Sequence, residues 1–273
     1  MPTKYLRISL CLLACWAVSH VNAAEQQAAN PAATDIVKQC NFKYPGDDQK
    51  STLTITLKDK DGNEKKNIYR RFWKAYHGAG GIEDKMVLFT EFPPDAQGAA
   101  FMRWGYTAQA DKNADQWLYL PVLKKIRRVS IRDPGDSFLG SDLTYGDISP
   151  RSVDADEHRL LQVQNKGGVE YYAIESVPRE NNALYGRTVS WYAKPGDWAN
   201  CNKLRVDYFD KKGEPLKQEL LKWQRVENAW IWDEVVIHNV QTNHTSIFQV
   251  RDVKINVGVK DDIFTERSLS LGP

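Results

Sequence analysis

Apolar and polar residues alternate strictly along residues 51–58. The apolar residues fall on one side of an extended chain, and threonines fill the positions between them. A period of two is the pattern of a strand with one buried face. Asp61-Gly62 suits a hairpin loop, and the aromatic-rich segment 68–76 follows as a partner strand. The pattern therefore predicts an antiparallel hairpin near the start of the folded chain.

Further segments have the same character, and short turns separate many of them. They span residues 85–92, 100–106, 116–120, 126–131, 159–164, 171–177, 188–192, 203–209, 216–226, 229–239 and 246–253. Regular strand spacing with little helical periodicity predicts a mainly β fold with minor α, built on one curved antiparallel sheet. Residues 35–39 could start a short helix that ends near Cys40.

Two connections interrupt the rhythm of strands. Residues 78–84 are Gly-rich, and residues 133–153 form a longer connection with several Gly and Pro. Phe138, Leu139, Leu143 and Tyr145 give the longer one an apolar side. Because long connections in a meandering sheet often cover a face or an opening, we expect this segment to do so.

The N-terminal 23 residues are typical of a secretory signal peptide. Lys4 and Arg7 precede an apolar run, and small residues at its end suit a signal peptidase. The run has about 11 residues, whereas a membrane-spanning helix needs roughly 20. We therefore expect residues 1–23 to be removed outside the cytoplasm, residues 24–34 to form a flexible leader and residues 35–273 to form one domain.

The same segment allows an alternative, in which a lipid anchors the protein to a membrane. Leu12-Leu13-Ala14-Cys15 resembles a lipobox, in which Cys15 would be lipidated and become the first mature residue. Cleavage there would leave Trp16 beside the acylated cysteine and shorten the apolar run to about seven residues. A protein without a lipid anchor is the expectation, and the anchor at Cys15 is the alternative.

The charge balance argues against one class of partner. The chain has 37 basic and 35 acidic residues, and removal of Lys4 and Arg7 leaves 35 of each. Proteins that bind polyanions usually carry a basic excess. We therefore expect no DNA or RNA partner.

Cys40 and Cys201 are the cysteines that remain after the signal segment. Outside the cytoplasm two cysteines most often form one disulfide. Closing so long a loop contributes at most about 4–5 kcal/mol in the entropic model. Two unpaired buried thiols are the alternative. No His or Cys lies at ligand spacing from either cysteine, which argues against a zinc site.

Catalytic and metal-binding patterns are weak. His238 and His244 lie in a predicted hairpin where two histidines could approach each other, but surface histidines are the ordinary case. Ser137, Asp142 and His158 have the residue types of a hydrolase triad, but no Gly-x-Ser-x-Gly elbow is present. No Gly-rich loop opens onto a helix to hold a nucleotide. We expect no enzyme, no metal and no cofactor.

Aromatic residues are the most distinctive part of the composition. The tryptophans on or near predicted strands include Trp104, Trp117, Trp191, Trp198, Trp223, Trp230 and Trp232. Such residues fill β cores and pair across strands. They could instead leave a concave face apolar and partly open to a lipid or acyl chain. Composition alone favours the core.

Residues 124–128, Lys-Lys-Ile-Arg-Arg, form the densest basic cluster. On a strand these cations point to both faces, so the cluster can serve as a charged edge that resists aggregation. Contact with lipid head groups or an acidic partner is the alternative.

Three stretches in order resemble a known family. They are Trp-Leu-Tyr-Leu-Pro at 117–121 with the basic cluster, residues 137–147, and residues 252–259 leading into 262–267. Over about residues 85–270 the chain resembles the LolA-like outer membrane lipoprotein-sorting proteins of Gram-negative bacteria. The resemblance implies an incomplete antiparallel β-barrel of about 11 strands, LolA/LolB-like, with short helices or loops over its concave face. It also implies a periplasmic location.

The resemblance carries an expected function. It implies a non-enzymatic periplasmic carrier or chaperone that binds a lipid or lipoprotein acyl chain in a hydrophobic hollow. An RND-family inner-membrane transporter or an outer-membrane acceptor is the expected partner, and the chain is expected to be a monomer. The alternative is a periplasmic sensor or adaptor that binds a protein partner through the same fold.

Candidate site residues follow from the predicted strands and the long connection. We expect Leu118, Leu120, Phe138, Leu143 and Trp191 to line the hollow. Arg127 and Arg128 are expected near its mouth or at a partner surface. The resemblance adds no catalytic residue, because binding in this family depends on the shape of a surface.

Overall fold

The structure, a computed structural model, describes residues 32–110, 112–129, 135–149, 151–181 and 183–272. The expected signal segment, the alternative lipidation site at Cys15 and most of the expected leader lie outside the described residues. Among the described residues, no helix is long and apolar enough to cross a membrane.

All strands belong to one antiparallel sheet of 13 strands, in the order β6-β5-β4-β3-β2-β1-β13-β12-β11-β10-β9-β8-β7. The strands are β1 (Asp48–Lys58), β2 (Glu64–Ala75), β3 (Ile82–Phe92), β4 (Ala100–Tyr106), β5 (Asp115–Leu120), β6 (Lys125–Arg128), β7 (Asp156–Lys166), β8 (Val169–Pro178), β9 (Arg187–Pro195), β10 (Asn202–Phe209), β11 (Pro215–Val226), β12 (Ala229–Asn239) and β13 (His244–Ile255).

The helices in the part of the chain that the structure describes are short. They are α1 (Ala33–Asn41) and α2 (Glu266–Leu271), with the 3-10 turns η1 (Ala79–Gly81), η2 (Pro94–Ala96), η3 (Ala108–Ala110), η4 (Pro121–Leu123), η5 (Phe138–Gly140), η6 (Val153–Ala155), η7 (Trp198–Asn200) and η8 (Asp261–Phe264). Helix α1 begins at Ala33, inside the segment that we expected to be a leader.

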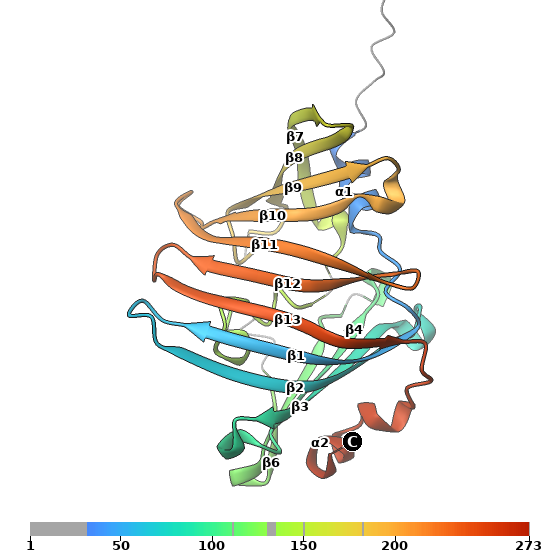
Figure 1. The fold of residues 1–273 in the computed structure, drawn as a ribbon, viewed down its shortest axis with the longest axis vertical. Coiled ribbons are helices and arrows are strands. Elements are labelled where there is room, and N and C mark those ends of the chain that lie inside the picture. Colours follow the sequence, from blue (N-terminus) through green and yellow to red (C-terminus); the bar gives the residue numbers. More distant parts are fainter. Residues whose placement is uncertain (1–31, 111, 130–134, 150, 182, 273) are drawn as a thin grey trace, which may run out of the picture. The chain divides into compact units, whose positions relative to one another are not determined.

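The mainly β prediction is confirmed, and each segment with a strand pattern overlaps a strand, although residues 130 and 131 of the segment 126–131 lie outside the described residues. The resemblance implies about 11 strands, and the sheet has 13. The sheet curves strongly but does not close into a barrel, because β6 and β7 form its two edges (Figure 1).

The first strand, β1, and the last strand, β13, are neighbours in the middle of the sheet. Strand β1 pairs with β2 on one side and with β13 on the other. Leu53 and Ile55, from the strictly alternating segment, oppose Val250 and Phe248 of β13. These four side chains are buried on the concave face, as a period of two requires.

The convex face of β2–β5 has its own apolar layer. Phe72, Met102 and Trp117 pack there against Phe264 and Leu269 of the C-terminal segment. Phe264 is fully buried, and Leu269 is 1% exposed. The C-terminal segment, drawn in red at the lower right of Figure 1, thus covers the convex side.

Helix α1 covers the concave face at the β7 end of the sheet. Ile36, Val37 and Cys40 form one apolar side of the helix and pack on Tyr172 of β8 and Tyr192 of β9. A disulfide joins Cys40 to Cys201, 161 residues away in the sequence. The predicted disulfide is therefore confirmed, and it holds the helix to the sheet.

Candidate functional site

The long connection lies across the concave face of the sheet, and we call residues 135–149 the strap. In Figure 1 it passes behind the strands, on the side away from the viewer. Phe138 and Leu143 are 2% and 3% exposed and belong to the main core cluster. The ring of Phe138 lies 5.1 Å from that of Phe101 on β4 and 6.5 Å from that of Phe248 on β13. The apolar side of the strap therefore fills the centre of the hollow.

A buried carboxylate ties the strap to β13. Oδ2 of Asp142 lies 2.6 Å from Nδ1 of His244, and it accepts a hydrogen bond of 2.6 Å from Oγ of Ser246. The backbone N–H of Asp142 donates to the same serine oxygen at 2.9 Å. Ser246 is fully buried. Charge-assisted hydrogen bonds of this kind are stronger than neutral ones, so this contact is a firm anchor.

A second carboxylate ties the strap to β11. Oδ2 of Asp147 lies 2.7 Å from Nζ of Lys217, and both side chains are less than a tenth exposed. Tyr185 donates its hydroxyl to both oxygens of Asp147 at 2.9 Å. Lys217 also donates to the backbone carbonyl of Asp142 at 2.8 Å. Because these charges are removed from water, the stability of the contact depends on each charge keeping its partners.

Gln116 on β5 holds the other side of the strap. Its Nε2 donates to the carbonyl of Tyr145 at 3.3 Å and to Oγ of Ser149 at 3.2 Å. The strap is therefore bound to both halves of the sheet, by β5 on one side and by β11 and β13 on the other.

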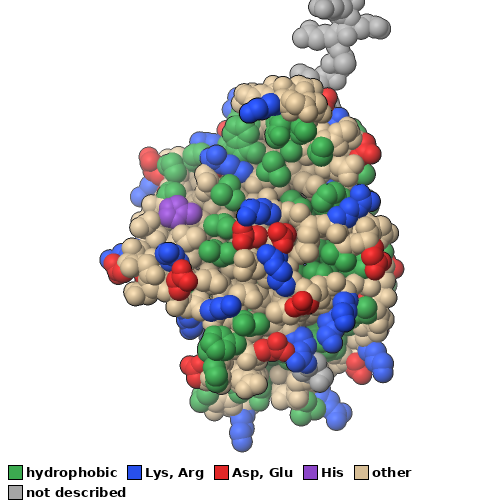
Figure 2. All heavy atoms as spheres, viewed as in Figure 1, with side chains coloured by type: hydrophobic (Ala, Val, Ile, Leu, Met, Phe, Trp, Pro, Cys, Tyr) green, Lys and Arg blue, Asp and Glu red, His purple; other side chains and the backbone are tan. Residues whose placement is uncertain are grey.

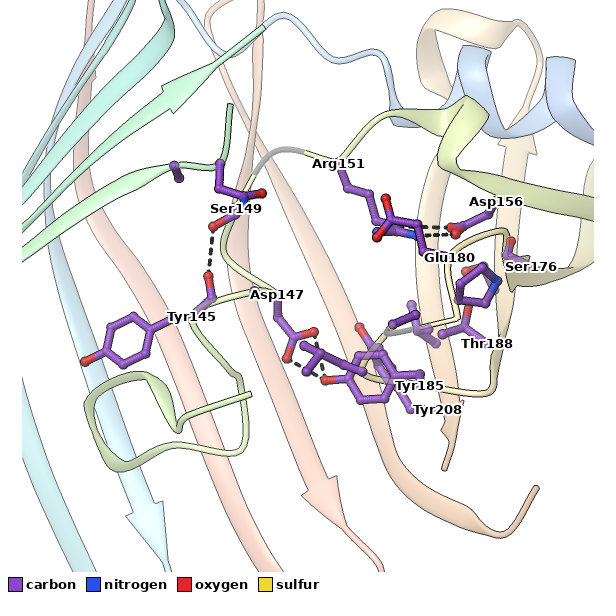
Figure 3. Close-up of a pocket in the computed structure, with 18 of the residues that line it drawn as sticks. Tyr145, Asp147, Ser149, Arg151, Asp156, Ser176, Glu180, Tyr185, Thr188 and Tyr208 are labelled. Carbon is purple, nitrogen blue, oxygen red and sulfur yellow. Dashed lines mark hydrogen bonds and ion pairs between the residues drawn. The ribbon is translucent and has the colours of Figure 1, made fainter. Parts of the chain in front are cut away.

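A cavity of about 510 Å³ lies beside the strap. Its walls come from β4 and β5, from the strap, from the connection between β8 and β9, and from β10. Figure 3 shows Asp147 pointing towards Tyr185 on one wall, and Arg151 paired with Asp156 at 2.5 Å on another. Small-molecule sites in proteins usually measure about 300–1,000 Å³, so this cavity has the size of a ligand site.

Tyr185 and Tyr208 of the cavity wall, and Glu219, which Tyr208 contacts, have shifted pKa values. Burial raises the pKa of Glu219, and the hydrogen bond from Tyr208 and the charge of Lys203 act against that shift. Tyr208 donates to Oε2 of Glu219 at 2.6 Å. Burial and the Asp147 carboxylate raise the pKa of Tyr185. The cavity is therefore polar and hydrogen-bonded, not a plain apolar tunnel.

The residues of the hypothetical hydrolase triad lie in separate contacts. Ser137 donates to the carbonyl of Ser141 at 2.6 Å, and Asp142 binds β13 as described. The ring nitrogens of His158 contact Ser176 Oγ at 2.8 Å and the carbonyl of Val153 at 2.9 Å. No nucleophile–base pair of the kind that a triad needs is formed by these three residues.

The two hairpin histidines do not meet either. The strand partner of His238 is Thr245, and that of His244 is Asn239, so the two rings belong to adjacent register positions on opposite faces. Among the described residues, no group of three or more His, Cys, Asp and Glu side chains is placed to hold a metal ion.

The structure brings some of the expected lining residues together. Phe138 and Leu143 lie in the main core cluster, and Leu118 packs against it from β5. Leu120 is half-buried at the end of the same strand. Trp191 is elsewhere: Thr188 and Ser190 of β9 line the cavity, and alternation places Trp191 on the convex face. There its indole N–H donates to Asp207 at 3.3 Å. This position does not support a role in lining the hollow.

Arg127 and Arg128 project from β6 to opposite faces of the sheet. Arg127 is the strand partner of Leu118, and Arg128 is that of Trp117, which is buried on the convex side. Arg128 forms an ion pair with the buried carboxylate of Asp115. Both arginines are exposed at the sheet edge.

Sequence reasoning missed the polar residues of the concave face. Lys217 and Glu219 are less than a tenth exposed, and they alternate with polar or half-exposed neighbours on β11. Lys217 and Glu219 lie four and two residues before the buried Leu221. Because side chains on a strand alternate between its two faces, all three lie on the same face of the sheet. That spacing was the available signal, but long charged residues on a strand usually indicate a solvent-exposed face.

Solved structures with the same fold include three bacterial proteins. A domain from Vibrio parahaemolyticus, described as an outer membrane lipoprotein-sorting protein, is 24% identical, with a TM-score of 0.74 over 87% of this chain and 98% of that one. A DUF1329 family protein from Desulfovibrio piger is 22% identical, with a TM-score of 0.77 over 87% and 98%. A LolA superfamily protein from Nitrosomonas europaea is 17% identical, with a TM-score of 0.62 over 86% and 98%.

No curated protein matches the chain. A family model described as "Uncharacterized protein" matches residues 82–271, which is more than half of the chain. The resemblance seen in the sequence is confirmed for the fold, since the structural neighbours include a LolA superfamily protein. The chain belongs to the family of that matching model, and its fold is LolA-like.

Proposed function

We propose that this protein is a non-enzymatic periplasmic carrier or chaperone for a lipid or a lipoprotein acyl chain. The observation that carries the proposal is the strap, whose buried Phe138 and Leu143 occupy the centre of a concave LolA-like sheet. These side chains stand where a hydrocarbon guest would lie. One of the solved neighbours is described as an outer membrane lipoprotein-sorting protein, which supports the proposal.

The physical basis of the proposed carrier function is that the acyl chain of the guest takes the place of apolar side chains of the strap. An acyl chain in water costs about 0.8 kcal/mol for each exposed CH₂, so it needs an apolar shelter to cross an aqueous compartment. When the strap moves outward, the guest covers the apolar surface that Phe138 and Leu143 leave. The net change in buried apolar area is then small, so loading and unloading need no ATP and depend on differences of affinity.

The cavity beside the strap gives the guest a place to start. Its polar wall, with Arg151 and Lys203 among the lining residues, suits a head group or an amide while the tail takes the place of the strap. An RND-family transporter or an outer-membrane acceptor would take the guest by offering higher affinity. We also propose that the carrier acts as a monomer.

One observation favours the second candidate function, a periplasmic sensor or adaptor. The concave core is filled by the chain's own residues, and a protein that binds its partner through the outer surface needs no open hollow. In that case Phe138 serves only the core.

The deciding experiment combines native mass spectrometry with uptake of a fluorescent fatty acid. Protein purified from the periplasm should carry lipid. The Phe138→Ala variant should take up more probe than wild type, because it empties part of the hollow. Phe89→Ala is the matched control, since Phe89 is a buried phenylalanine of the convex layer. Protein that never carries lipid, together with no uptake by either wild type or Phe138→Ala, would leave the adaptor as the better reading.

A further inference from the structure

A groove of about 990 Å³ lies on the convex face, between β13, β1, β2 and the C-terminal segment. Its apolar lining comes from Phe72 on the sheet and from Val257, Val259, Ile263 and Leu271 beyond β13. Phe72 and Val259 are buried at the base of the groove, whereas Val257 and Leu271 are 50% and 72% exposed. An exposed apolar rim around a concave site is typical of a surface that binds a partner or ligand.

Four cations surround this apolar groove. Lys50, Lys254, Lys260 and Arg267 line it, and Asp262 is the acidic residue among the lining residues. Among the described residues, none of the four cations makes an ion pair. The whole chain has a formal net charge of only +2, so this local excess is not a property of the surface in general. Figure 2 shows both basic and acidic side chains on the face that it draws.

The sheet side of the groove combines charge and apolar surface directly. Nζ of Lys50 lies 5.7 Å from the centre of the Phe72 ring, and both residues line the groove. An ammonium over an aromatic ring stays available to an anion, because the ring holds it without neutralising it. A ligand with an apolar body and an anionic end matches this arrangement.

The walls of the groove are held in place by the protein's own contacts. The carboxylate of Asp48 accepts hydrogen bonds from the backbone N–H groups of Val257, Gly258 and Val259 at 2.8–3.1 Å. Lys74 donates to the carbonyl of Val259 at 3.0 Å and pairs with Asp261 at 2.8 Å. Because these contacts already order the segment, ligand binding would not require the loss of conformational entropy that ordering a flexible site costs.

We propose that this groove binds a single-chain anionic amphiphile, with its tail on Phe72 and Leu271 and its carboxylate or phosphate among the lysines. Charge complementarity selects an anion, and the apolar lining of the groove suits a hydrocarbon tail. The volume of about 990 Å³ lies at the upper end of ordinary ligand sites. The site is on the opposite face from the strap and does not depend on the proposed carrier function.

The first test measures affinity for dansylaminoundecanoic acid and for its uncharged methyl ester. The acid should bind wild type at least ten times more tightly than the ester. The Lys254→Glu/Lys260→Glu variant should lose at least tenfold in affinity for the acid. Lys65→Glu/Lys66→Glu is the matched control, since these lysines are exposed on β2 away from the groove, and it should bind as wild type does. Equal affinity for acid and ester, or no effect of the groove variant, would overturn the proposal.

The second test locates the ligand. A diazirine-bearing palmitate, cross-linked and mapped by mass spectrometry, should label residues 257–272, and Leu271→Asp should abolish that label. Labels confined to residues 135–149 would overturn the groove site while supporting the concave site. Labels confined to residues 257–272 would support the groove site and count against the concave site. Binding to anionic vesicles without any binding of the monomeric probe would also overturn the proposal, because a membrane surface would then be the ligand.

Discussion

The Asp147 carboxylate and the Lys217 ammonium lie 2.7 Å apart and nearly buried, and they join the strap to β11 across 70 residues of sequence. Neither charge has much access to water, so each depends on the other. The pair therefore couples the strap tightly to the sheet.

Removing one partner of this pair should be costly. Lys217→Met leaves Asp147 buried without its cation, and we expect a loss of about 3–5 kcal/mol in the free energy of unfolding. The measurement is chemical denaturation of wild type, both single variants and the double variant Asp147→Asn/Lys217→Met. The double variant should lose much less than the sum of the single variants, because no uncompensated charge remains. Additive losses would contradict the coupling.

Phe138→Ala should create a cavity under the strap. The side chain is 2% exposed and contacts the rings of Phe101 and Phe248, so we expect a loss of about 3–5 kcal/mol in stability. The change in thermal midpoint and in the denaturant midpoint measures it. A loss below about 1 kcal/mol would mean that the strap contributes little to the core, against its burial.

The disulfide should stabilise the attachment of α1. Cys40→Ala/Cys201→Ala opens a loop of 161 residues, and we expect a loss of about 2–5 kcal/mol in the free energy of unfolding. Denaturation with and without a reductant provides the control, because the reductant should lower the stability of wild type and leave the variant unchanged. A variant as stable as oxidised wild type would show that packing of Ile36 and Val37 holds the helix alone.

Glu219 should make stability depend on pH. Burial raises its pKa in the folded protein above the ordinary 4.5. Below that value both states are protonated; as the pH rises, the unfolded chain loses its proton first, so the folded state is progressively destabilised until its own Glu219 ionises. The stability of Glu219→Gln relative to wild type should therefore increase from about pH 4.5 upwards.

Glu234 is the matched control for that experiment. Hydrogen bonds from Lys222 and Gln249 lower its pKa in the folded protein, so its contribution is present at neutral pH and is lost as the pH falls. Glu234→Gln should thus change stability with pH in the opposite sense. Parallel curves for the two variants would show that the Glu219 effect is not due to burial.

Asp48 should order the segment that forms the convex groove. Its carboxylate accepts three backbone hydrogen bonds and is 6% exposed, and hydrogen bonds to a charged group contribute about 1.5–3 kcal/mol each. Asp48→Ala should lower stability by several kcal/mol in total and speed hydrogen exchange at residues 257–259. Unchanged exchange there would show that Lys74 and the apolar contacts suffice.

Much of the fold follows from local patterns. A period of two identifies the strands, and the short helix that ends near Cys40 was expected from residues 35–39. The pairing of Cys40 with Cys201 followed from their number and from the expected compartment. The resemblance predicted a LolA-like sheet correctly and implied about 11 strands, against 13 in the structure, because family likeness says little about the edges of a sheet.

The candidate site was less predictable. The apolar residues of the strap were recognised as a cover, and Phe138 and Leu143 do lie inside the hollow. Trp191 was assigned to the wrong face, because composition shows that a strand is aromatic but not which of its two faces meets the core.

By itself, the sequence determined the strands, the short helix and the apolar character of the strap, because each depends on neighbours in the chain. Only the tertiary structure decided which charges are buried. His244 meets Asp142 across 102 residues, and Lys217 meets Asp147 across 70, because the curvature of a 13-stranded sheet brings them under one strap. The convex groove has the same origin, since it forms only where the segment after β13 folds back over β1 and β2.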